Sequence, residues 1–279
     1  MMFGSAEALL DRLKNAEREV VFLVGSPLTA PAQVGAPGVP GVAGMIERVR
    51  DVFERDAALA QLDAALAGAE SGYQTAFRFL LERRGPDKQN RIIRDAVRCA
   101  RLPDPAGVDE GKSDLSLEND IDGWHFPPGV SALGAIVAAL PERFGRLVLT
   151  TNFDPLIGLS IRRAGGHTHT LKLHGDICLE AVAADGCAVV HLHGYWHGSD
   201  TLHNPQQLGQ PRPQLEASLA RLLRQKTVVV LAYGGWDDIF TRSLVQVIRG
   251  ELAAIDVLWT FHGADPQRLA QDHAGLLAN

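Results

Sequence analysis

The chain has 279 residues, 46% of them hydrophobic and 22% charged, so it can bury the core of a folded domain and is not disordered. Its formal net charge is −6 and no dense Lys/Arg run occurs, which argues against nucleic acid as the direct ligand. No uncharged apolar run is long enough to span a bilayer, and residues 1–19 predict an amphipathic helix rather than a signal peptide, so we expect no membrane association.

The three cysteines, Cys99, Cys178 and Cys187, form no C-x-x-C pair. Their number and spacing exclude a disulfide scaffold and a four-cysteine zinc site supplied by this chain. Cysteine usage of this kind fits a reducing compartment, and we therefore expect a cytoplasmic protein.

Short, continuously apolar runs rich in β-branched residues predict strands buried on both faces of a sheet. They lie at residues 20–24, 147–150, 227–231 and 257–261. Segments of helical periodicity separate them, at residues 42–53, 131–140, 155–164, 214–224 and 238–252. This alternation predicts an α/β fold with a doubly wound parallel sheet, formed by residues 1–279 as a single domain.

Residues 56–130 depart from this alternation. Helical stretches at residues 57–81 and 88–101 precede an acidic, loop-rich segment at residues 107–123. We interpret this region as a helical insertion or lid beside the sheet, with plain helical cover as the alternative. Residues 167–210 contain only short strand-like pieces, and residues 265–279 predict a terminal helix.

The first predicted strand ends in a loop of small residues. Ligands of open α/β sheets bind beyond the carboxyl ends of the strands. Gly25 permits a tight turn, and the hydroxyls of Ser26 and Thr29, with nearby N–H groups, could contact phosphate oxygens. Pro27 removes one donor, and the loop is neither G-x-G-x-x-G nor a P-loop, so an ordinary strand–helix connection is the alternative.

Polar side chains also follow the second strand, in Thr150-Thr151-Asn152-Phe153-Asp154. The amide of Asn152 could hold a water or a ribose hydroxyl. Asp154 could accept from a carboxamide or a hydroxyl, and it could also cap the helix that begins near Pro155. The third strand ends in a glycine-rich turn, residues 232–238.

Seven of the ten histidines fall between residues 167 and 203, which raises the question of a metal site. Their spacing matches no zinc pattern, and Gly175 and Gly194 would break a helix aligning them, so we expect no metal. Leu-His-Gly occurs twice, around His174 and His193. A neutral imidazole held by a glycine turn is a suitable general base, although a structural role is the default for any one histidine.

Taken in order, these motifs resemble those of sirtuins, in which a glycine-rich loop, an Asn-x-Asp segment, a His-Gly dipeptide and a late glycine-rich turn follow one another. The resemblance extends from residue 20 to about residue 262. It is nearest to the sirtuin-like effector domains of bacterial antiviral defence proteins. In such proteins the domain often precedes a nucleotide-binding oligomerisation module.

The resemblance implies a Rossmann-like domain that binds NAD, with Asn152 and His193 as the catalytic pair. Asn152 would orient water or stabilise the ribosyl centre, and His193 would act as the base. We prefer His193 to His174 because the residues after His193 resemble those after the His-Gly of the family. The NAD-binding residues implied are Gly25, Ser26, Pro27, Thr29, Thr151, Asp154, Gly234, Gly235, Trp236 and Asp237.

The sequence departs from classical deacylating sirtuins in three ways. The four zinc-binding cysteines are missing, Ser26-Pro27 replaces Ala-Gly, and no arginine follows Gly38-Val39-Pro40. These departures count against acyl-lysine chemistry more than against NAD binding.

We therefore expect an NAD hydrolase that releases nicotinamide and ADP-ribose and depletes NAD in antiphage defence. Expected partners are a C-terminal or separate nucleotide-binding sensor module and further copies of the chain, which would then be part of a longer protein. The alternatives are a non-catalytic sensor of NAD or a derived nucleotide, and a sirtuin-type deacylase or ADP-ribosyltransferase.

Overall fold

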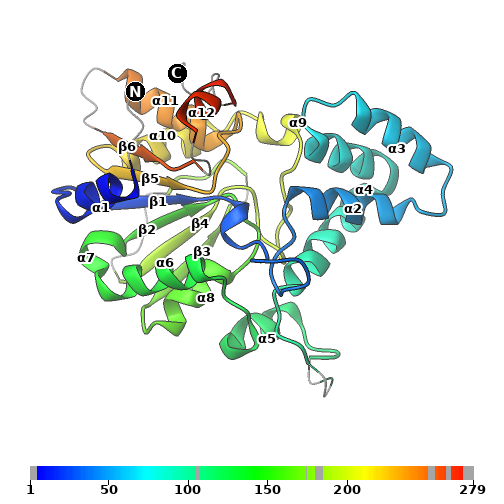
Figure 1. Ribbon diagram of the computed structural model, residues 1–279, viewed down its shortest axis with the longest axis horizontal. Coiled ribbons are helices and arrows are strands. Elements are labelled where there is room, and N and C mark those ends of the chain that lie inside the picture. The colour runs from blue at the N-terminus through cyan, green and yellow to red at the C-terminus, as the bar shows by residue number, and fades with distance from the viewer. Residues whose placement is uncertain are drawn as a thin grey trace.

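A parallel six-stranded sheet forms the centre of the protein (Figure 1), as a computed structural model shows for residues 5–104, 107, 109–173, 175–179, 185–250, 255–261 and 265–272. The strand order is β3-β4-β2-β1-β5-β6, and every neighbouring pair is parallel. The strands are β1 (Val20–Val24), β2 (Leu147–Thr150), β3 (Thr168–Lys172), β4 (Cys187–His191), β5 (Thr227–Leu231) and β6 (Asp256–Trp259). The predicted Rossmann-like α/β fold is confirmed.

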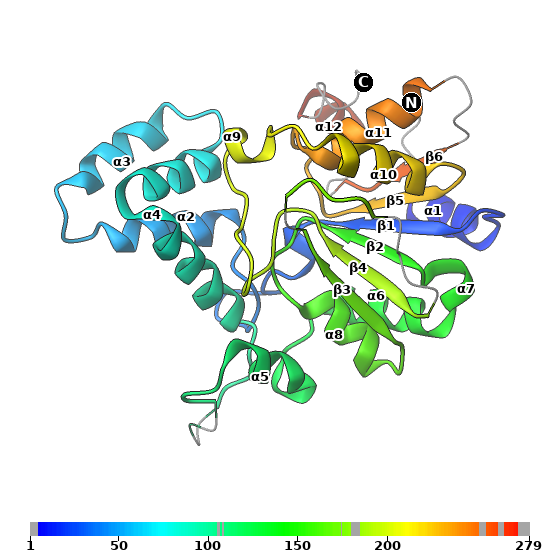
Figure 2. The same cartoon turned by 180° about the vertical axis from the view of Figure 1, so that it is seen from behind.

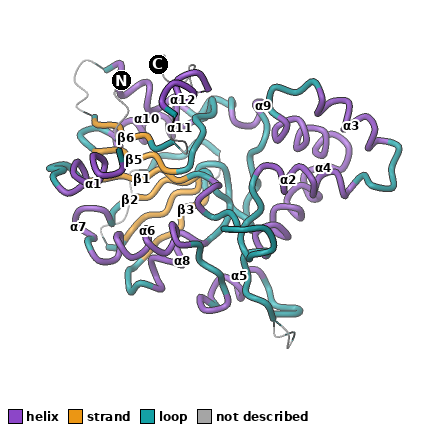
Figure 3. Tube along the Cα trace, viewed as in Figure 1, coloured by secondary structure: helices purple, strands orange, loops and turns teal. Residues whose placement is uncertain are grey.

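Helices connect most of these strands (Figure 3), although no described helix lies between β3 and β4. The helices of the described residues are α1 (Ala6–Lys14), α2 (Val42–Val52), α3 (Ala58–Ala67), α4 (Gly72–Arg98), α5 (Asp114–Asn119), α6 (Pro128–Ala139), α7 (Pro141–Phe144), α8 (Leu156–Arg163), α9 (Pro205–Leu208), α10 (Pro213–Leu223), α11 (Ile239–Arg249) and α12 (Pro266–Asp272), with short 3-10 turns η1 (Ser26–Leu28) and η2 (Ile121–Gly123). The five helices expected between strands form, with ends shifted by a few residues.

Two layers of helices cover the sheet, one on each face (Figures 1 and 2). Val21 and Leu23 of β1 pack with the apolar sides of α10 and α11. Val20, Phe22 and Val24 point the other way and pack with α6 and α8. Burial on both faces explains why β1, β2 and β5 are continuous apolar runs in the sequence.

A lobe of helices, α2 to α5, lies beside the carboxyl ends of the strands (Figure 1). Its own apolar core includes Phe53, Leu62, Phe77 and Trp124. The helix expected at residues 57–81 is divided, because α3 ends at Ala67 and α4 begins after Ser71, whose side chain caps it. Gly85, with a non-helical φ of 77° and ψ of 176°, interrupts α4 just before Pro86. The part of α4 that follows, up to Arg98, corresponds to the helix expected at residues 88–101. Among the described residues, no helix is both long and apolar enough to cross a bilayer.

The chain passes very close to itself where β1 and β5 end. The N–H of Gly25 donates to the carbonyl of Leu231 at 3.0 Å. A Cβ on Gly25 would lie 2.0 Å from the carbonyl oxygen of Ala232, a residue that itself has a positive φ of 55°. Only glycine therefore fits at position 25, and this contact fixes the spacing of the two loops that follow β1 and β5.

We predict that Gly25→Ala lowers the free energy of unfolding by about 1–3 kcal/mol, because the added methyl group forces the two loops apart. Denaturant unfolding measures the change. Gly68→Ala is the matched control, since nothing lies within 4 Å of a Cβ there and its φ is −102°. Equal stability of Gly25→Ala and the unaltered protein would contradict the prediction.

Candidate functional site

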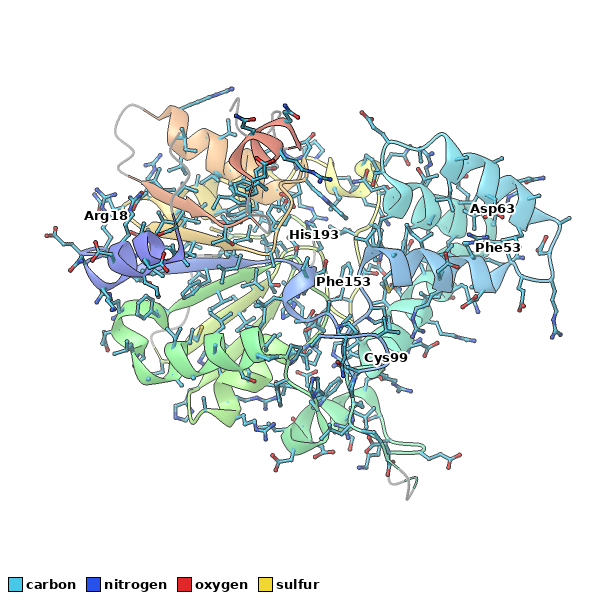
Figure 4. The ribbon with its side chains drawn as sticks, viewed as in Figure 1. Arg18, Phe53, Asp63, Cys99, Phe153 and His193 are labelled. Atoms are coloured by element: carbon cyan, nitrogen blue, oxygen red, sulfur yellow. The ribbon has the colours of Figure 1, made fainter. Side chains whose placement is uncertain are left out.

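A cavity of about 710 Å³ lies where β1, β2 and β5 end. One wall comes from the loops after these strands and from His193, and the other comes from α2 and α4 of the lobe. Figure 4 shows His193 and Phe153 between the sheet and the lobe, with Phe53 and Asp63 farther out in the lobe. The lobe contributes mostly apolar side chains: Met45, Tyr73, Ile93, Ala96 and Val97.

Thr29 links the loops after β1 and β2. Its hydroxyl donates to Oδ2 of Asp154 at 2.9 Å and accepts from Nδ2 of Asn152 at 3.1 Å. Because the single hydroxyl proton goes to the carboxylate, the amide must present its nitrogen to Thr29. The contact therefore fixes the orientation of the Asn152 amide as well as its position.

Asn152 is held on its backbone side as well. Its N–H donates to the hydroxyl of Thr150 at 3.0 Å, and its carbonyl accepts from Nδ1 of His191 at 2.7 Å. Burial lowers the pKa of His191 to about 4, so this imidazole is neutral and can donate. The side chain of Asn152 is only 2% exposed, yet its Oδ1 has no hydrogen-bond partner. A buried acceptor of this kind in a cavity wall is available to a ligand.

The carboxyl group of Asp154 has an unusual pKa. Burial raises the pKa of its carboxyl to about 6, although hydrogen bonds from Thr29 and from the N–H of Leu156 oppose the shift. Oδ1 accepts from the N–H of Leu156, the first residue of α8, while Oδ2 binds Thr29. The N-cap of α8 is Pro155 and not Asp154 as expected, so Asp154 lies one residue before the cap, on the cavity wall.

His193 reaches the same cavity from the turn after β4 and is 3% exposed. Its Nε2 lies 2.8 Å from Oδ2 of Asp238, which also accepts from the hydroxyl of Tyr233 at 2.6 Å. Gly194 makes the turn tight: its φ is 97°, and a Cβ there would lie 2.1 Å from the carbonyl oxygen of Asp200. The Leu-His-Gly sequence therefore holds the imidazole against a carboxylate.

Asp238 is the N-cap of α11 and is completely buried. Burial alone would raise the pKa of this carboxyl, but hydrogen bonds from His193, the Tyr233 hydroxyl and the Thr241 N–H outweigh it and hold the pKa below its ordinary value. Asp238 is therefore an ionised acceptor at neutral pH.

The predicted residues divide into two groups. Eight line the cavity: Ser26, Pro27, Thr151, Asn152, Asp154, His193, Gly234 and Trp236. Four do not line it: Gly25, Thr29, Gly235 and Asp237. Gly25 and Thr29 instead support residues of the cavity wall, Gly25 through its close contact with Ala232 and Thr29 through its hydrogen bonds to Asn152 and Asp154. The side chain of Asp237 is 89% exposed and lies 3.4 Å from Arg242.

The loop after β1 offers fewer phosphate donors than its sequence indicates. The N–H groups of Gly25, Leu28 and Thr29 all donate to carbonyl groups of the protein. Ser26 is the exposed residue of this loop that lines the cavity and can donate through N–H and hydroxyl. Among residues 25–29, Ser26 is therefore the one suited to contact an anion in the cavity.

The other histidines between residues 167 and 203 have separate surroundings. His203 is buried, and its ring nitrogens contact Tyr73 at 2.8 Å and Thr201 at 2.7 Å. His197 pairs with Glu118 at 2.7 Å. In the part of the chain that the structure describes, no three His, Cys, Asp or Glu side chains gather as a metal site. His174, the alternative to His193, lies outside the described residues.

The residue that the sequence prediction missed is Asp238. The prediction assigned Asp237 to the site, but the side chain of Asp237 is exposed, whereas Asp238 is completely buried. A signal was present: Asp238 and Thr241 are spaced as the N-cap and N3 residues of a capping box, and both reciprocal hydrogen bonds form. An N-cap side chain turns back toward its helix, which here directs the carboxylate to the interior.

We predict that Asp154 makes stability depend on pH. The carboxyl binds its proton more tightly in the folded protein, with pKa about 6, than in the unfolded chain, so its contribution falls as pH rises from about 4 to about 6. The fall is about 3 kcal/mol. Asp154→Asn should remove this slope from the pH profile of the unfolding free energy. Exposed Asp51→Asn should leave it intact, and an unchanged slope in Asp154→Asn would contradict the assignment.

Comparison with known proteins gives similarities to solved structures and to one protein family. The chain is similar to the crystal structure of a Sir2 homolog–NAD complex. The alignment covers 100% of this chain and 97% of the other chain, at 12% sequence identity and a TM-score of 0.38. None of the curated proteins compared with the sequence matches it. The SIR2-like domain family matches residues 146–278. The segment that carries Asn152, His193 and Asp238 thus matches a SIR2-like domain.

Proposed function

We propose that the chain binds NAD in the cavity at the ends of β1, β2 and β5 and hydrolyses its nicotinamide–ribose bond. The observation that carries the proposal is that Asn152 and His193, 41 residues apart in sequence, line one cavity, each held by a buried carboxylate or hydroxyl. The SIR2-like match over the same residues supports it.

The reaction breaks the bond between ribose C1 and the pyridinium nitrogen, and the bonding electrons leave with nicotinamide. The oxygen of water then bonds to C1, and one proton of that water goes to a base. The products are nicotinamide, ADP-ribose and a proton. The transition state resembles an oxocarbenium ion, so the protein must orient the ribose and one water rather than supply a strong nucleophile.

Asn152 is suited to orienting that water or a ribose hydroxyl. Its Nδ2 is occupied by Thr29, which leaves the buried Oδ1 as an acceptor. An acceptor fixed in this way can bind one O–H group without changing its own protonation. The amide therefore holds a nucleophile in place and does not compete for its proton.

His193 is suited to accepting the proton. Its Nε2 is engaged by Asp238, and its ring stacks near Trp236, with the ring centroids 6.2 Å apart. The apolar lobe wall limits water in the cavity, which strengthens electrostatic interactions with the reacting groups. Together these features favour proton transfer to the imidazole from a bound hydroxyl or water.

We predict that Asn152→Ala and His193→Ala each reduce NAD cleavage by about 10²–10⁴-fold, the contribution typical of a positioned acid–base group. Chromatography of nicotinamide and ADP-ribose measures turnover, and thermal unfolding verifies that each variant folds. His197→Ala is the matched control, because His197 contacts Glu118 and does not line the cavity.

The products also separate this function from its alternatives. Free ADP-ribose in equal amount to nicotinamide supports hydrolysis. Nicotinamide without free ADP-ribose would instead indicate transfer to a protein or an acyl group. NAD that binds in calorimetry but stays intact on prolonged incubation would indicate a sensor, and wild-type turnover in both alanine variants would refute the assigned roles.

We also propose that this activity serves antiphage defence by depleting cytoplasmic NAD, in an assembly with a nucleotide-binding sensor module and further copies of the chain. The resemblance to sirtuin-like defence effectors supports this role. Cellular NAD measured during infection, in cells with the unaltered protein and with Asn152→Ala, tests it. Equal NAD levels in the two strains would refute it.

A further inference from the structure

We infer that Asp238 is a positioning residue that sets the tautomer of His193, with one carboxylate oxygen binding the imidazole and the other holding the start of α11. The inference rests on the proposed function for its catalytic consequence only. The hydrogen bonds that it describes belong to the protein itself and can be tested without turnover.

The two oxygens of Asp238 have separate tasks. Oδ1 accepts from the N–H groups of Phe240 and Thr241 at 3.0 and 3.1 Å, which caps α11. Oδ2 accepts from His193 and from Tyr233, at 2.8 and 2.6 Å. One buried side chain thus joins the imidazole to the end of a helix that packs against the sheet.

Tyr233 strengthens this arrangement. Its hydroxyl accepts from the N–H of Trp236 at 3.0 Å and donates to Oδ2 of Asp238 at 2.6 Å, an acceptor nearer than the carbonyl of Trp236 at 3.3 Å. Burial raises the pKa of Tyr233 above its ordinary value, which keeps this proton in place. The glycine-rich turn after β5 is thereby connected through Asp238 to His193.

The direction of the His193 hydrogen bond follows. An ionised carboxylate has no proton to donate, so Nε2 must carry the hydrogen that joins the two groups. In the neutral imidazole, Nδ1 is then the nitrogen with the free lone pair. Nδ1 is therefore the atom of His193 that accepts a proton from a bound hydroxyl or water.

Asp238→Asn tests this tautomer with little change in shape. The remaining carbonyl oxygen can still cap α11, since Asn is as good an N-cap as Asp. The new NH₂ group replaces Oδ2 and donates both to Nε2 and to the Tyr233 hydroxyl, whose own proton turns to the carbonyl of Trp236, 3.3 Å away. The bond to Nε2 moves the imidazole hydrogen to Nδ1. We predict that kcat for NAD cleavage falls about 10²–10⁴-fold, while KM stays within about threefold.

The direct readout is the pair of ring-nitrogen chemical shifts of His193 in ¹⁵N-histidine-labelled full-length protein, assigned with His193→Ala. The neutral ring should show a protonated Nε2 in the unaltered protein and a protonated Nδ1 in Asp238→Asn. Asp176→Asn is the matched control, because Asp176 accepts from the N–H groups of Gln214 and Leu215 at the start of α10. It should alter neither the His193 shifts nor kcat.

The outcomes separate the two proposals. A swapped tautomer in Asp238→Asn supports the inference even if the unaltered protein leaves NAD intact, a result that would refute the proposed function alone. An unswapped tautomer, or wild-type kcat in a cleaving Asp238→Asn protein, overturns the inference and leaves the proposed function standing. Loss of kcat in Asp176→Asn equal to that in Asp238→Asn would also overturn it, because the effect would then be one of capping.

Discussion

The hydrogen bonds of the Thr29 hydroxyl determine the geometry of the site. This group accepts a hydrogen bond from Asn152 and donates one to Asp154, and so joins the loops after two neighbouring strands. Because the Thr29 hydroxyl has a single hydrogen, the two bonds have fixed directions, and the Asn152 amide must face Thr29 with its nitrogen. The free Oδ1 of Asn152 is a consequence of that choice.

The central strands of the sheet lie close together at their carboxyl ends, and this makes the hydrogen bonds of Thr29 possible. β1 lies between β2 and β5, and the connections from β1 and β5 lead in opposite directions. At such a switch point the loops diverge and leave a crevice. Gly25 sets how near the two chains come, since any side chain there would meet the Ala232 carbonyl. The position of Thr29 therefore depends on a glycine that does not line the cavity itself.

The sequence predicts the central strands β1, β2 and β5 well, because burial on both faces leaves continuous apolar runs. It predicts β3 and β4 poorly. β3 is an edge strand whose residues, Thr168–Lys172, are largely polar and partly exposed, so no apolar run marks it. β4 is buried throughout, but it lies in a segment rich in Gly and His residues, and the strand itself ends in His191.

Within the site, residues that lie directly after a strand were predictable, since the strand fixes where they point. Asn152 and Asp154 are of this kind. The choice between Asp237 and Asp238 was not predictable from strand position, because it depends on where α11 begins. The lobe wall could not be predicted from the sequence either. Met45 and Val97 line the cavity only because segments distant in the sequence pack together.

The two walls of the cavity differ in chemistry, and this difference fits the proposed cleavage of NAD. The sheet wall presents an amide, an imidazole and a carboxyl whose pKa lies near 6, while the lobe wall is mostly apolar. A pyridinium ring loses its positive charge when its bond to ribose breaks, so an environment poor in water favours the neutral leaving group over the cation. The ribose and the water need fixed polar partners, and these come from the sheet wall. The lobe would therefore contribute to the reaction by excluding solvent, while the buried hydrogen bonds of Thr29 and Asp238 hold the reacting groups in place without reorganisation.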